Sequence, residues 1–225
     1  MLVVPIFLDG FALIFDLDGV IVDSNPVHVE VWRAYLKRYG IDPGDSLPDR
    51  MYGRRNDEIV RDFFGSCLTP EEVFAHGAAK EALYRQAIKP QLQQRLVPGI
   101  VSFLERHRKR PKGLATNAEP ANAEFILRES GLRDHFSVMM DGHQVNRPKP
   151  DPEIYVRTAQ LLSVAPRNCV VFEDSSAGVE AASEAGANVV ALRTTHVSFP
   201  RADLTVDNFL SPELEPWLGQ LAVVS

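Results

Sequence analysis

Residues 12–24 read ALIFDLDGVIVDS, and the predicted fold is built around this stretch. Its first four residues are apolar and end abruptly at Asp16 and Asp18, with Gly19 directly behind them. An apolar run that stops at a charged, glycine-containing turn is typical of a buried strand that leads into a site. Side chains on a strand repeat every second residue, so Asp16 and Asp18 are predicted to face the same space. Two carboxylates there repel each other, and a divalent cation is the natural group to offset their charge.

The composition is that of an ordinary globular protein of 225 residues, of which 45% are hydrophobic and 24% charged. Cys67 and Cys169 have no CxxC or Cys/His spacing, so we expect reduced thiols in a cytoplasmic protein. The net charge of −6 argues against nucleic acid and anionic membranes as partners. No stretch reaches the ~20 apolar residues of a membrane span. The modest size favours a monomer.

Short apolar segments alternate with helical segments in the second half of the chain. Strands are predicted at residues 12–15, 112–116, 136–140, 169–172, 188–192 and 204–206. Helices are predicted at residues 100–108, 121–130, 151–162, 177–185 and near 212–218. This alternation indicates an α/β fold with a doubly wound parallel sheet.

The block between the first two predicted strands is different, because it contains helical patterns and no evident strand. Helices are predicted at residues 28–40, 56–64, 70–86 and near 89–95. The third of these has a clear start, since Thr69 can cap it and Pro70 suits its first position. We therefore predict an all-helical cap domain at residues 25–95, inserted into a core domain made of residues 1–24 and 96–225.

Polar residues follow the predicted strands of the core. In doubly wound sheets, ligands bind at the carboxyl ends of the strands. Each of these residues alone has an ordinary explanation as a helix cap or a turn residue. Together they offer hard oxygen ligands for Mg²⁺ and donors for a phosphoryl group. They are Asp16 and Asp18, Thr116 and Asn117, Glu173 and Asp174, with Lys149 at a helix start.

Four motifs in this order resemble those of the haloacid dehalogenase superfamily. They are DLDGVIVDS at 16–24, LATN at 114–117, RPKPDPEIY at 147–155 and FEDSSAGVEAA at 172–182. The chain is similar over nearly its whole length to the subgroup that includes β-phosphoglucomutase and small sugar-phosphate phosphatases. The resemblance implies a Rossmann-like core with a helical cap. It also implies Mg²⁺-dependent hydrolysis of a small phosphorylated metabolite.

The resemblance also implies roles for individual residues. Asp16 is the nucleophile that forms an aspartyl-phosphate, and Asp18 is the general acid and then the base. Asp18 must be protonated for part of such a cycle, so we expect its pKa to lie above the ordinary value. Thr116 and Lys149 bind the phosphate and act in catalysis, with Asn117 beside them. The implied magnesium ligands are Asp16, the backbone carbonyl of Asp18, Glu173 and Asp174.

Contacts to the substrate are expected from the cap. The candidates are His28, Arg54, Arg55 and Lys80. His28 matches a histidine of β-phosphoglucomutase-like proteins and is expected to touch the substrate or to orient Asp18. Lys80 falls roughly where those proteins have a cap lysine. The alternatives are a histidine packed on the core and a solvated helix lysine.

A phosphatase is favoured over two other functions. Mutases of the family carry an arginine at the end of a GxxR segment, and here residues 53–56 read GRRN. Asn56 therefore stands where that arginine falls, which favours a hydrolase over a β-phosphoglucomutase. A non-catalytic ligand-binding protein of the same fold is the third possibility. It is disfavoured because no catalytic position departs from the motifs.

Overall fold

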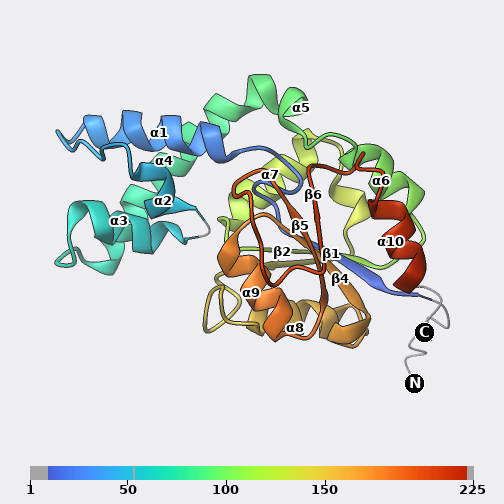
Figure 1. The fold of residues 1–225 in the computed structure, drawn as a ribbon. Helices are drawn as coiled ribbons and strands as arrows, with labels where there is room; N and C mark the ends of the chain where they lie inside the picture. The colour runs from blue at the N-terminus through green and yellow to red at the C-terminus, as the bar shows by residue number, and fades with distance from the viewer. Residues whose placement is uncertain (1–9, 53, 222–225) are drawn as a thin grey trace.

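The computed structural model of the protein describes residues 10–52 and 54–221 (Figure 1). Its centre is a six-stranded sheet in which all neighbouring strands are parallel, in the order β3-β2-β1-β4-β5-β6. The strands are β1 (Ala12–Phe15), β2 (Lys112–Thr116), β3 (Val138–Asp141), β4 (Cys169–Glu173), β5 (Asn188–Leu192) and β6 (Leu204–Val206). The order reverses between β1 and β4, which places the ligand-binding edge at the carboxyl ends of these two strands. The doubly wound parallel sheet predicted from the sequence is confirmed.

Helices cover both faces of the sheet. One face carries α8 (Glu153–Leu161) and α9 (Ser176–Glu184), and the other carries α6 (Ile100–Arg106), α7 (Pro120–Glu129) and α10 (Leu214–Leu221). Strand β1 serves both faces because its side chains alternate. Leu13 and Phe15 pack with α6, α7 and α10, whereas Ala12 and Ile14 pack with α8 and α9. The result is a three-layer core around a fully buried strand.

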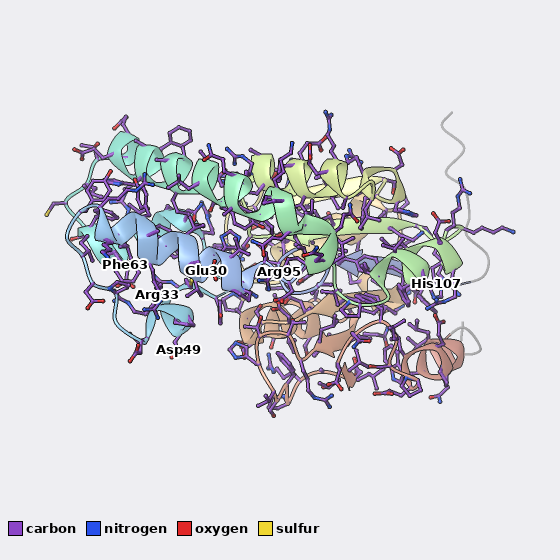
Figure 2. All side chains as sticks on the ribbon, turned by 90° about the horizontal axis from the view of Figure 1, so that it is seen from above. Glu30, Arg33, Asp49, Phe63, Arg95 and His107 are labelled. Atoms are coloured by element: carbon purple, nitrogen blue, oxygen red, sulfur yellow. The ribbon has the colours of Figure 1, made fainter. Side chains whose placement is uncertain are left out.

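In the described part of residues 25–95, the regular elements are all helices. It contains α1 (Asn25–Lys37), α2 (Leu47–Met51), α3 (Asn56–Phe64), α4 (Pro70–Ile88), the short 3₁₀ turn η1 (Lys89–Gln91) and α5 (Leu92–Arg95). These helices have a hydrophobic cluster of their own, centred on Trp32, Tyr35 and Leu36. They lie beside the sheet in Figure 1. In Figure 2, Phe63 of this part and His107 of the core lie at opposite ends of the molecule, with Arg95 between them.

The all-helical cap that the sequence predicted is therefore present. The short helix α2 was not expected. The residue bounds proposed for the two domains remain a prediction, and residues 1–9 of the proposed core lie outside the described part of the chain. The start of α4 follows the predicted capping pattern, because the Thr69 hydroxyl accepts from the backbone N–H of Glu72 at 3.2 Å. Strand β3 begins at Val138 rather than at residue 136, since Phe136 turns inward to meet Phe15 edge-on.

Two chain segments join the cap to the core, and they lie side by side. Val22 and Leu96 form an antiparallel bridge, and the backbone N–H of Asp23 donates to the carbonyl of Arg95 at 2.7 Å. The stretch after β1 is folded back on itself, with the N–H of Gly19 donating to the carbonyl of Val22 at 2.7 Å. Both crossings from cap to core therefore pass close behind the carboxyl end of β1.

The aromatic cluster under β1 gives a prediction about stability. Phe103 is fully buried against Phe15, Phe172 and Phe209, with ring centroids 4.9–6.3 Å apart. We expect Phe103→Ala to lower the free energy of unfolding by about 3–5 kcal/mol, measured by urea denaturation, because it leaves a cavity. Val101 on the same helix is 46% exposed, and Val101→Ala should change stability by about 0.5 kcal/mol or less. Equal effects of the two substitutions would contradict this view of the core.

Candidate active site

The carboxyl ends of β1, β2 and β4 meet at one cleft beneath the cap helices. Its lining includes Asp16 and Asp18 after β1, Thr116 and Asn117 at the end of β2, Lys149, and Asp174 and Ser175 after β4. The cap contributes His28, Arg54 and Lys80 to the same cleft. The structure therefore brings together residues that the sequence predicted from four separate motifs. Asp16 and Asp18 line the same cleft as expected, although β1 ends at Phe15 and both aspartates lie in the turn that follows it.

Lys149 is held in the centre of this cleft by two acids. Its ammonium nitrogen lies 2.9 Å from Oδ1 of Asp16 and 2.6 Å from Oε1 of Glu173, and it also donates to the carbonyl of Ala115 at 3.0 Å. The side chain is only 3% exposed. Burial alone lowers the pKa of Lys149, but the charges of Asp16 and Glu173 raise it above its usual value by more. The lysine is therefore a fixed positive charge beside Asp16.

Glu173 is fully buried, and both of its carboxylate oxygens accept hydrogen bonds. Oε1 accepts from Lys149 and, at 2.6 Å, from the hydroxyl of Tyr155. Oε2 accepts from the backbone N–H groups of Asp174 and Ser175, at 2.9 and 3.1 Å. Burial raises the pKa of Glu173, but the charge of Lys149 and the hydrogen bonds from Lys149, Tyr155 and Ser175 together lower it below the ordinary value. This carboxylate acts as a buried anchor for the lysine.

Asp16, Glu173 and Asp174 form a cluster of buried carboxylates whose oxygens lie within 4.8 Å of one another. Burial, opposed by Lys149 and reinforced by repulsion from Glu173, raises the pKa of Asp16 to about 7. Burial and repulsion from Glu173 and Asp16 hold the pKa of Asp174 well above its usual range. These carboxylates are hard oxygen donors, and each opposes the ionisation of the others by like charge. A divalent cation such as Mg²⁺ would bind such oxygens and offset that repulsion.

Asp174 has polar neighbours of its own. It accepts a hydrogen bond from the hydroxyl of Thr195, and at 3.3 Å from the side chains of Thr194 and Asn25. Gly19 allows this carboxylate to come close, because a Cβ at residue 19 would collide with it, and the φ of +77° also favours glycine. The glycine of the DxDG stretch thus makes room for the acid that follows β4.

Thr116 lies at the end of β2 with 1% of its surface exposed, and its hydroxyl oxygen accepts from the backbone N–H of Ala118 at 3.1 Å. That hydrogen bond leaves the hydroxyl proton available to a ligand in the cleft. Asn117 lines the cleft beside it. Both positions suit donors to a phosphate oxygen.

Asp18 lies between the phosphate end of the cleft and the cap. Its Oδ1 accepts a hydrogen bond from the hydroxyl of Ser24 and lies 3.6 Å from Nε2 of His28. Burial raises the pKa of Asp18, but the nearby His28 and the hydrogen bond from Ser24 together lower it by more, so the pKa lies below its ordinary value. The expectation of a raised pKa is therefore wrong for this structure. A place beside Asp18 is one of the two expected for His28 from the sequence, whereas the contact from Ser24 was not predicted.

His28 and Lys80 meet inside the protein. Lys80 is 1% exposed, and its ammonium group donates to Nδ1 of His28 and to Glu81, both at 2.7 Å. An ammonium group only donates, so the proton of the His28 ring is on Nε2, facing Asp18. The ring stacks on Tyr84 at 3.8 Å between centroids. The alternative of a solvated helix lysine at residue 80 is therefore wrong.

The arginines of the cap are placed differently. The guanidinium of Arg54 lies 3.2 Å from Asp62 and donates to the carbonyl of Arg50 at 2.9 Å, although the residue lines the cleft. Arg55 lies 3.3 Å from Asp57, outside this cleft. Asn56 donates to Glu81 at 2.6 Å. Gly53 of the GRRN segment lies outside the described residues.

Several cleft residues were not predicted from the sequence. Glu81 and Asn122 form a buried hydrogen bond of 2.6 Å between α4 and α7, and Asn25 donates to Thr195 at 2.8 Å. Their neighbours along the chain belong to ordinary helix and loop patterns, so no motif marked them. Asn25 carried the best signal, because it directly follows the DLDGVIVDS motif.

This arrangement belongs to a known class of enzymes. The sequence model of the haloacid dehalogenase-like hydrolases matches residues 12–186, and the chain belongs to this family. The predictions of the family and of an enzyme of the hydrolase class are thereby confirmed.

Among its relatives, the fructose-1-phosphate phosphatase YqaB of Escherichia coli is 32% identical over 183 residues, which cover 80% of this chain and 95% of the relative. The phosphorylated carbohydrates phosphatase of Thermotoga maritima is 33% identical over 177 residues, which cover 78% and 81%. The crystal structure of β-phosphoglucomutase from Clostridium difficile superposes with a TM-score of 0.83 at 28% identity, covering 96% of this chain and 100% of the other. In the part of the chain that the structure describes, no helix has the length and apolar character needed to cross a membrane.

The Lys149 pairings give a prediction about pH and stability. Removing the lysine leaves two buried carboxylates without a counter-charge, so Lys149→Ala should lower the free energy of unfolding at pH 8 by about 3–5 kcal/mol. Ionised Glu173 adds stability above its unfolded pKa in the wild type, and this is lost as the pH falls. In the variant the same acid is penalised for ionising, so the deficit should shrink at pH 5.

Denaturation with EDTA present, at both pH values, measures this difference. The control is Lys109→Ala, an exposed lysine of the core, which should change stability by about 0.5 kcal/mol or less at either pH. A deficit in Lys149→Ala that is equal at pH 5 and pH 8 would contradict the assignment of Lys149 as the counter-charge.

Proposed function

We propose that the protein is a Mg²⁺-dependent phosphatase that hydrolyses a small phosphorylated metabolite through an aspartyl-phosphate. One observation carries the proposal. Asp16 lies 2.9 Å from a buried lysine, inside a cluster of carboxylates suited to a metal, at the end of the central strand. A nucleophile, a fixed cation and hard oxygen ligands are the parts that phosphoryl transfer needs. The phosphatases among the relatives support the choice of reaction.

Asp16 and Asp174 are the residues that would hold the cation, together with the backbone carbonyl of Asp18. Glu173, expected from the sequence as a further ligand, already accepts hydrogen bonds on both oxygens, so we propose that it acts by holding Lys149. Bound Mg²⁺ would neutralise charge on the phosphoryl oxygens. Its presence would also relieve the like-charge repulsion that raises the pKa of Asp16 and Asp174.

In the proposed reaction, Asp16 attacks the phosphorus with a carboxylate oxygen while the ester oxygen departs. Lys149 and the Thr116 hydroxyl bind phosphoryl oxygens, which keeps the phosphoryl group oriented for attack. Asp18 gives a proton to the departing oxygen and then takes one from the water that hydrolyses the aspartyl-phosphate.

Asp18 must gain a proton despite its low pKa. Its neighbours hold the carboxylate in an orientation that faces the cleft. Ser24 and the Nε2–H of His28 both point to this carboxylate, which fixes its orientation toward the cleft. An incoming phosphate ester adds negative charge beside Asp18, which favours its protonated form. The general acid role is therefore expected to depend on bound substrate.

The cap offers no arginine suited to a second phosphate among the described residues that line the cleft, which favours hydrolysis over mutase chemistry. A mutase must bind a bisphosphate at both ends, which requires a cation on the cap side. Arg54 is already paired with Asp62, and Asn56 donates to Glu81. The likeness to β-phosphoglucomutase structures keeps the mutase testable. Conversion of β-glucose 1-phosphate to glucose 6-phosphate faster than hydrolysis of either would overturn the phosphatase proposal.

Substitution of the proposed nucleophile tests the covalent mechanism. Asp16→Asn should reduce release of phosphate from p-nitrophenyl phosphate by a factor on the order of 10³ or more, because the amide cannot form the acyl phosphate. Asp134→Asn removes an exposed acid of the core and should leave the rate unchanged. Undiminished turnover in Asp16→Asn would rule out the mechanism, and inactivity of the wild type towards a broad ester panel would favour a non-catalytic protein.

Removal of the metal tests the proposed ligands. Wild-type protein treated with EDTA should lose phosphatase activity and regain it with Mg²⁺. Asp174→Asn should raise the Mg²⁺ concentration needed for half-maximal activity by at least about tenfold, because a carboxylate ligand is lost. Activity that survives EDTA treatment, or an unchanged Mg²⁺ requirement in Asp174→Asn, would contradict this metal site.

A further inference from the structure

The cap side of the cleft carries a buried carboxylate that the proposed reaction does not use. Glu81 of α4 is 4% exposed and lines the cleft next to Lys80. Its Oε1 accepts from Lys80 at 2.7 Å and from Asn56 at 2.6 Å, and its Oε2 accepts from Asn122 at 2.6 Å. Burial raises the pKa of Glu81, but the charge of Lys80 together with His28 and the hydrogen bonds from Lys80 and Asn122 lowers it by more, to about 2. The group is therefore a negative charge at every physiological pH.

Glu81 cancels the charge of Lys80, the buried lysine of the cap that lines the cleft. The separation of 2.7 Å makes a direct ion pair, and the pair is buried, so water screens it little. The other long cations lining the cleft are also paired. Arg54 lies 3.2 Å from Asp62, and Lys149 lies 2.9 Å from Asp16. Among the described residues that line the cleft, every lysine and arginine thus has a carboxylate within salt-bridge distance.

The rest of the cap side is uncharged. Trp32, Met51, Tyr52 and Ile59 supply apolar and aromatic surface, and Asn56 supplies an amide. Such a wall suits hydroxyl groups and carbon stacked on aromatic rings. A second anionic group placed there would meet only cations that are already paired with a carboxylate. It would also approach Glu81, and like charges in a partly dry cleft repel strongly.

We propose that Glu81 is a specificity-determining residue that restricts the leaving group to uncharged, hydroxyl-rich molecules and rejects those with a second anionic group. The inference rests on the proposed phosphatase function and concerns the cap side of the same cleft. Lys80, without Glu81, would attract a carboxylate or second phosphate. The ion pair removes that attraction while Lys80 still holds Nδ1 of His28.

Two pairs of esters that differ only at the end remote from the phosphate test this. Sorbitol 6-phosphate and 6-phosphogluconate form the six-carbon pair, and glycerol 3-phosphate and 3-phosphoglycerate form the three-carbon pair. In each, a CH₂OH group is replaced by a carboxylate. Wild-type protein with Mg²⁺ should have a higher kcat/KM for the ester without the carboxylate, by at least about tenfold in one pair or both. The ratio within a pair is independent of the fraction of active protein.

Variants change the ratio in opposite directions. Glu81→Gln leaves Lys80 without its counter-charge, so the preference for the ester without the carboxylate should shrink by about tenfold. Lys80→Gln leaves Glu81 uncompensated, so the preference should grow. The matched control is Glu71→Gln, which removes an exposed charge of the same sign from the first turn of the same helix and should leave the ratio unchanged.

The outcomes separate this inference from the proposed function. A wild-type ratio near one in both pairs, or a ratio unaffected by Glu81→Gln, overturns the role of Glu81 while the phosphatase activity stands. Release of phosphate from p-nitrophenyl phosphate but from none of the four esters overturns the inference alone. Release from none of these five compounds with Mg²⁺ present overturns the proposed function and this inference with it.

Discussion

The interaction on which the rest of the structure depends is the buried contact of Lys149 with Asp16 and Glu173. These acids end the neighbouring parallel strands β1 and β4, so the sheet itself forces their carboxylates together. Without a cation the burial of both would be unfavourable, because each ionised group loses its hydration. Lys149 lies in the loop before α8, and its ammonium group offsets that charge. The same contact supports the fold and sets the electrostatics of the cleft.

On the cap side, a second buried acid is likewise neutralised by a buried lysine. Lys80 and Glu81 are adjacent in sequence, yet both are buried, and Asn122 of the core caps the pair through Glu81. The cleft therefore lies between two neutralised pairs in a chain whose net charge is −6. The pairs differ in how much charge remains. Asp16 and Asp174 leave an excess of negative charge suited to a cation, whereas the Lys80–Glu81 pair is balanced.

The core could be predicted from the sequence because a parallel sheet follows few rules. Short apolar runs identify the strands, and the carboxyl ends of neighbouring strands must share an edge. These two rules are sufficient to group Asp16, Thr116 and Asp174 from the amino-acid sequence alone. The low pKa of Asp18 was not predicted, because it depends on Ser24 at the N-cap of α1 and on His28 in the first turn of that helix both reaching this carboxylate.

The cap was harder to predict for a physical reason. A helix of charged and apolar residues such as α4 gives no sign of which polar side chains meet another helix, because helix packing has many registers. Lys80 and Glu81 are typical of a solvated face, but contacts to His28, Asn56 and Asn122 from three other helices bury both. Strand ends thus reveal the reaction. The proposed selection of the leaving group depends on contacts between helices, and the sequence pattern does not show which side chains make them.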